Sequence, residues 1–117
     1  GKKCRLLIDT GASKTVFDKK SIYKFIKEKW LIKEEQFSFA VTGGPMEMHS
    51  VKLNLKINTL NIKNYISAIL DLNSFNDAYR AYNCKPIDGV LGSDILLKYE
   101  FIIDYSKKEL RFINKLK

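Results

Sequence analysis

The sequence predicts one mainly β domain, spanning residues 1–117, with two or three short helices. Short runs of β-branched and aromatic residues alternate with polar ones, as in half-buried strands. Gly, Asn and Pro interrupt these runs where turns are expected. A hydrophobic content of 45%, with 12% aromatic residues, indicates a packed core instead of disorder. The chain is long enough for one domain with a modest core.

The first third of the chain predicts a strand and a helix. Lys3 to Ile8 reads as a strand that becomes fully apolar as it approaches Asp9. Asp18 is a plausible N-cap for a helix that continues to Trp30. Its apolar side has helical spacing and consists of Ile22, Phe25, Ile26 and Trp30.

The middle of the chain predicts a long hairpin with a glycine-rich tip. Phe37 to Val41 alternates as a strand and ends at Thr42-Gly43-Gly44-Pro45. A second strand runs from Met46 to Ile57, and its apolar residues change parity at His49-Ser50, which predicts a bulge or a bend there. A further strand is expected over Lys63 to Leu70.

The last third predicts four more elements. Asn73 to Asn83 is expected to form a short helix, and Ile87 to Leu91 an apolar strand. Asp94 to Tyr99 predicts a second short helix. Phe101 to Ile113 predicts a hairpin that turns at Ser106-Lys107-Lys108. This hairpin is expected to supply strands either to the main sheet or to a subunit interface.

Composition limits the classes of function. The net charge is +8, but the lysines are spread along most of the chain, which favours a solvated surface over a nucleic-acid site. No apolar run approaches the roughly 20 residues that span a bilayer. Cys4 and Cys84 are too few for a zinc site and could at most form one disulfide, and His49 is the only histidine. We therefore expect no metal and no cofactor.

The chain opens at Gly1-Lys2-Lys3, in the middle of a pattern and without an initiator Met. We interpret it as a fragment of a longer polypeptide, so its compartment is not indicated.

Asp9 is the strongest candidate for chemistry. An apolar strand ends at this carboxylate, and the small residues after it would let a backbone or a substrate approach. The alternative is an Asx-turn, in which the aspartate only caps its own loop. Other carboxylates have structural interpretations. Asp71 lies at a strand end and Asp88 in a loop, whereas Asp94 is interpreted as a helix cap and Asp104 as part of a hairpin turn.

The strings LLIDTGAS and IDGVLGSD together resemble the single-lobed, retropepsin-like aspartic proteases. The resemblance covers nearly the whole chain in order. It implies an acid-protease fold, a closed, orthogonal, barrel-like sheet with a flap hairpin. It assigns the substrate-binding flap to Thr42, Gly43, Gly44, Pro45 and Met46, and the support of the active-site loop to Thr10, Gly11, Ala12 and Ser13.

The resemblance also implies a mechanism. The chain holds a single Asp-Thr-Gly, so the family's catalytic pair would need a homodimer with one Asp9 from each subunit. Two carboxylates held so near to each other cannot both ionise easily, so one of them keeps its proton. The ionised member would activate a water, which attacks the peptide carbonyl of an extended substrate.

Two departures favour cellular or bacterial relatives over retroviral ones. Ser13 and Ser93 occupy positions where many retroviral members have an acidic residue and an arginine. The main alternative is an inactive, retropepsin-like dimerisation or peptide-binding module. A basic, nucleic-acid-binding β domain is less favoured, because the face of Lys52, Asn54 and Lys56 carries no aromatic residue for stacking.

Overall fold

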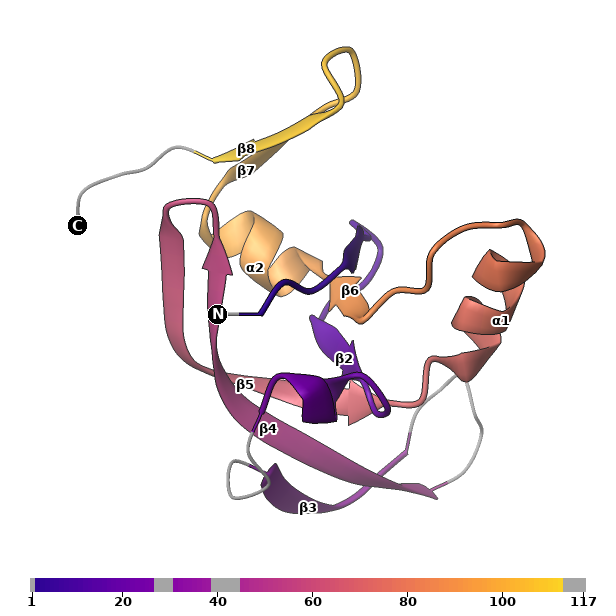
Figure 1. The fold of residues 1–117 in the computed structure, drawn as a ribbon. Helices are drawn as coiled ribbons and strands as arrows, with labels where there is room; N and C mark the ends of the chain where they lie inside the picture. Colours follow the sequence, from indigo (N-terminus) through magenta and orange to yellow (C-terminus); the bar gives the residue numbers. More distant parts are fainter. Residues whose placement is uncertain (1, 27–30, 39–44, 113–117) are drawn as a thin grey trace.

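The computed structural model describes residues 2–26, 31–38 and 45–112; for residues 31–38 and 45–49 it describes the backbone only. Figure 1 shows the arrangement, which confirms a mainly β fold. The elements are β1 (Leu6–Ile8), β2 (Val16–Asp18), η1 (Ile22–Lys24), β3 (Leu31–Ser38), β4 (Pro45–Ile57), β5 (Leu60–Leu70), α1 (Asn73–Ala81), β6 (Gly89–Leu91), α2 (Ser93–Lys98), β7 (Phe101–Asp104) and β8 (Glu109–Phe112). No helix within the described ranges is long and apolar enough to cross a membrane.

Six strands form one mixed sheet in the order β1-β6-β2-β5-β4-β3. β6 lies between β1 and β2, parallel to the first and antiparallel to the second. Val90 of β6 is opposite Leu7 on one side and Val16 on the other. The connection between β1 and β2 must therefore pass around the end of β6, and this connection contains Asp9.

The β4–β5 hairpin supplies much of the core. From Val51 to Lys56, buried apolar and exposed polar residues alternate, as a strand with one wet face requires. The buried residues pack in one cluster with Phe17 from β2 and Ile95 from α2. The core thus lies between the hairpin and the elements that hold the β1–β2 connection.

Of the bulge or bend predicted at His49-Ser50, the bulge is wrong. The pairing of β4 with β5 runs without a shift from His49 to Leu53, and the register changes between Leu53 and Leu55. The extra residue belongs to β5, where Asn64 has a φ of 57° and its N–H donates to Asn54 Oδ1 at 2.9 Å. Because the irregularity lies on the partner strand, the apolar pattern of β4 gives no sign of it.

The predicted helix from Asp18 to Trp30 is also wrong over its described part. Asp18 ends β2, and only Ile22–Lys24 forms a single 3₁₀ turn; residues 27–30 lie outside the described residues. The buried Asp18 carboxylate accepts hydrogen bonds from Ser21 N–H and from Leu72 N–H, far away in sequence. These bonds fold the chain back toward β5, and tertiary contacts override the helical spacing.

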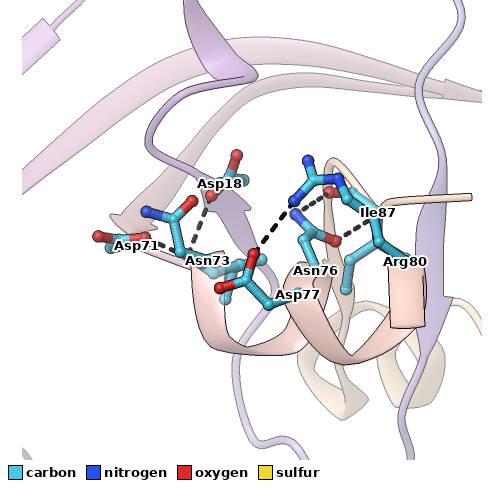
Figure 2. Close-up of polar contacts among 8 residues, drawn as sticks. Asp18, Asp71, Asn73, Asn76, Asp77, Arg80 and Ile87 are labelled. Carbon is cyan, nitrogen blue, oxygen red and sulfur yellow. Dashed lines mark hydrogen bonds and ion pairs between the residues drawn. The ribbon is translucent and has the colours of Figure 1, made fainter. Parts of the chain in front are cut away.

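Helix α1 confirms the helix expected over residues 73–83, and a single asparagine holds it to the segment before β6 (Figure 2). Ile87 N–H donates to Asn76 Oδ1 at 2.7 Å, and Asn76 Nδ2 donates to Ile87 O at 3.1 Å. The Asn76 side chain thus bonds both backbone polar groups of Ile87, as a neighbouring strand would. Because Asn76 is only 4% exposed, these two hydrogen bonds are shielded from water.

Asn76→Ala should lower the free energy of unfolding by about 1–3 kcal/mol, because it leaves both polar groups of Ile87 unpaired and buried. Urea unfolding of the two proteins measures the difference. Asp77→Ala is the matched control on the same helix, since among the described residues the exposed Asp77 pairs with Arg80 alone (Figure 2). It should change stability by no more than about 0.5 kcal/mol. Equal losses in the two variants would contradict this assignment.

The predicted C-terminal hairpin is confirmed, and it forms a two-stranded sheet of its own (Figure 1). Asp104 holds its turn by accepting hydrogen bonds from Ser106, the Lys107 N–H and Arg111. These donors lower the pKa of Asp104 from 3.8 to about 2. A lowered pKa means that the charge stabilises the turn above about pH 4, and that this contribution is lost as the pH falls toward 2.

Candidate active site

Asp9 follows β1 and is held by backbone contacts on both sides. Its N–H donates to Leu91 O at 3.0 Å, which extends the β1–β6 pairing by one residue. Its Oδ1 accepts the Gly11 N–H at 2.9 Å, and its carbonyl accepts the Ala12 N–H at 3.2 Å. Within the described residues Asp9 Oδ2 accepts no hydrogen bond. The half-buried carboxylate therefore has a fixed direction and one oxygen left for a second group.

The residues from Asp9 to Thr15, here called the active-site loop, cross residues 91–93, here called the crossing segment. Ser93 N–H donates to Ala12 O at 2.7 Å, and Gly92 N–H donates to Thr15 Oγ1 at 2.9 Å. Together with the Asp9–Leu91 bond, these contacts join the beginning, middle and end of the loop to the crossing segment. The two strings far apart in sequence are thus brought into direct contact.

The crossing is close enough to require glycine. A Cβ on Gly92 would lie 2.6 Å from Lys14 C and 2.9 Å from Ala12 O. Gly92 has a φ of −97°, which any residue can adopt, so space and not backbone conformation demands glycine here. A Cβ on Gly89 would similarly lie 2.4 Å from Val16 O.

A hydrogen-bond network that the sequence reasoning missed supports the end of the loop. Asp94 Oδ1 accepts both the N–H and the hydroxyl of Thr15, at 3.0 and 2.8 Å, and its Oδ2 accepts the Tyr65 hydroxyl. Burial, followed by the Asp94 carboxylate, raises the pKa of Tyr65 well above its usual value. The interpretation of Asp94 as a helix cap is wrong, because Gly92 occupies that position of α2. One available signal was Ser67, a polar residue on the inward face of β5.

The remaining predicted site residues divide into two groups. Thr10, Gly11 and Ser13 are exposed on the loop, and Ala12 is half-buried. Of the expected flap, Thr42, Gly43 and Gly44 lie outside the described residues. Pro45 and Met46 begin β4 and pair with Ser38 and Phe37 of the antiparallel strand β3.

The other carboxylates serve the fold. Asp71 Oδ1 accepts the Asn73 N–H at 2.9 Å, and Asp88 Oδ2 accepts the Arg5 N–H at 2.7 Å. Asp104 holds the β7–β8 turn. Within the described ranges, no three residues of the His, Cys, Asp and Glu types gather as metal ligands.

No protein-family model and no curated protein matches the chain in sequence. Among solved structures, it resembles the retroviral protease-like domain of Ddi1 from Leishmania major, with a TM-score of 0.63. The match covers 96% of this chain and 80% of that domain at 13% identity. The fold is retropepsin-like. At so low an identity the likeness concerns the fold, so activity has to be argued from the site.

The retropepsin-like fold explains why the chain orders its strands as it does. The parallel β1–β6 pair and the antiparallel β2–β6 pair form a frame of three hydrogen-bonded strands. The active-site loop connects β1 to β2 at one end of this frame. A carboxylate on such a frame is held more rigidly than one on an isolated loop, as acid–base chemistry requires.

Proposed function

We propose that this chain is an aspartic endopeptidase that cleaves extended peptides as a homodimer. The observation that carries the proposal is the setting of Asp9, whose carboxylate is fixed through Oδ1 while Oδ2 has no partner within the described residues. In the dimer, each subunit contributes one Asp9. One carboxylate activates a water by taking its proton, and the other donates a proton to the carbonyl oxygen of the substrate.

Exposed apolar residues on β1, α2 and the β7–β8 hairpin support a second copy of the chain as the partner. Ile8, next to Asp9, is 41% exposed, and Leu97 of α2 is 75% exposed. The β7–β8 hairpin has an exposed Ile102 and projects away from the six-stranded sheet (Figure 1). One face of the hairpin packs against the core through Phe101 and Leu110, which leaves the Ile102 face open to a partner. We propose that the partner subunit covers these residues when it brings its own Asp9 to the pair.

The substrate would be an extended peptide under the β3–β4 hairpin. The hairpin would cover the bound peptide from above and exclude water from the reacting carbonyl. We propose that Thr42 to Met46 cover the bound peptide and that Thr10 to Ser13 support the active-site loop on its other side.

The test is to measure assembly and cleavage on the same samples. Sedimentation over a range of concentrations at pH 5–7 gives the dimer fraction, and a peptide library gives the specific activity. This pH range lies above the window in which Asp104 loses its charge, so the hairpin stays intact. Specific activity should rise in proportion to the dimer fraction, because only the dimer holds two copies of Asp9.

Leu97→Glu should shift the protein to an inactive monomer, since it adds a charge to the proposed interface. Ile66→Glu is the matched control, because Ile66 is 53% exposed on β5, outside the proposed interface. It should leave assembly and cleavage unchanged. A wild-type dimer that cleaves no peptide would refute the proposal and favour a peptide-binding module. Full activity in a strict monomer would refute the pairing of Asp9.

A further inference from the structure

Thr15, the last residue of the active-site loop, is 1% exposed, and both its N–H and its hydroxyl are hydrogen-bonded. Its N–H and hydroxyl donate to Asp94, and its hydroxyl oxygen accepts the Gly92 N–H. The Ser67 hydroxyl lies 3.2 Å from its carbonyl oxygen. These hydrogen bonds fix the conformation of this end of the loop.

The Asp94 carboxylate is the centre of this arrangement. It accepts three donors, two from Thr15 and one from the Tyr65 hydroxyl. Within the described ranges no Lys or Arg forms an ion pair with it. Hydrogen-bond donors with fixed directions therefore hold this partly buried charge, and bonds to an ionised acceptor are the stronger kind.

We propose that Asp94 and Tyr65 are positioning residues for the catalytic carboxylate. The inference rests on the proposed function of Asp9. The contacts run from Tyr65 through Asp94 to Thr15, and from Thr15 to Gly92 in the crossing segment. The other two residues of that segment bond to Asp9 and to the middle of the loop. A displaced Thr15 would thus shift the support beneath Asp9.

Positioning has a kinetic signature that simple stabilisation lacks. Proton transfer between the pair and the water depends on sub-ångström placement, whereas the apolar contacts that bind an extended peptide do not. Loss of the network should therefore lower kcat and leave KM nearly unchanged. The effect should appear in dimers that are fully folded and fully assembled.

Three variants and one control test the proposal. Tyr65→Phe and Asp94→Ala should each lower kcat at least about tenfold at an unchanged dimer fraction, with KM within about twofold. Asp94→Asn should recover most of kcat, because its amide oxygen can accept from Thr15 and its amide N–H can donate to Tyr65. Tyr79→Phe is the control, since Tyr79 is also half-buried but its hydroxyl makes no hydrogen bond within the described residues. It should match wild type.

Amide hydrogen exchange at Asp9 and Gly92 reads the positioning independently of catalysis. Exchange should accelerate in Tyr65→Phe and Asp94→Ala and stay unchanged in Tyr79→Phe. Unchanged exchange in the first two variants, or accelerated exchange with an unchanged kcat, would overturn the proposal. A wild-type dimer without cleavage would instead refute the proposed function, and with it a catalytic role for the network. Amide exchange would then test only whether Asp94 and Tyr65 hold the loop in place.

Discussion

Replacing Asp9 by Asn should abolish peptide cleavage and leave folding and assembly unchanged. The Asn side chain keeps an oxygen that can accept the Gly11 N–H, so the loop should retain its shape. It cannot take a proton from water or hold one for the substrate. Losing general acid–base catalysis costs on the order of 10²–10⁴-fold in rate. The expected result is no measurable cleavage and no binding of a pepstatin-type inhibitor, at a wild-type unfolding midpoint.

Asp71→Asn provides a matched control for this variant. Asp71 directly follows strand β5, and its Oδ1 accepts the N–H two residues ahead at 2.9 Å, the same local contact that Asp9 makes. Asp71 is exposed and lies outside the crossing of loop and β6. Asp71→Asn should cleave as wild type does. Residual cleavage in Asp9→Asn near the wild-type rate would refute the assignment.

Mixing the two proteins tests the pairing itself. At equal amounts of wild type and Asp9→Asn and a fixed total concentration, random assembly leaves about one quarter of the dimers with two Asp9 side chains. Activity should fall to about one quarter of that of pure wild type. A fall to about one half would mean that each Asp9 acts without its partner.

The parts of the fold that were predictable are those with a local signal. The apolar run into Asp9 and the small residues after it indicated a strand end and a tight loop, and the apolar run from Ile87 to Leu91 indicated a second strand. The structure brings these strings together. Their contact could be expected only through the family resemblance, since neither string by itself specifies its partner.

The missed parts depend on partners far away in sequence. β2 was not predicted, because three residues are too few to show strand alternation, and its pairing is decided by β5 and β6. The same pairing prevents Asp18 from starting a helix. Asp94 was interpreted as a cap because caps are local, whereas its real partners, Thr15 and Tyr65, come from the loop and from β5. Polar side chains on inward positions were the only sequence sign of this network.

Gly92→Ala should destabilise the fold and nearly abolish activity at once. The added Cβ would lie 2.6 to 2.9 Å from backbone atoms of Lys14 and Ala12, which cannot move as the end of a side chain can. The loop must shift, at a cost of about 1–3 kcal/mol or more in the free energy of unfolding. A displacement of this size beneath Asp9 should lower kcat about 100-fold. Urea unfolding and peptide cleavage measure the two effects.

Gly11→Ala is the control for Gly92→Ala. It enlarges a small residue of the same loop without crowding the backbone. Among the described residues its Cβ would meet only the Asp9 Oδ1, at 3.3 Å, and a shift of a few tenths of an ångström relieves this contact without breaking the bond from the Gly11 N–H. The free energy of unfolding should therefore stay within about 0.5 kcal/mol of wild type, whatever happens to substrate binding. If both alanine variants unfolded like wild type, the crossing would be more compliant than its contacts imply, and the loop would need another source of rigidity. A large loss at Gly92 and none at Gly11 would attribute the rigidity of the active-site loop to its crossing with β6.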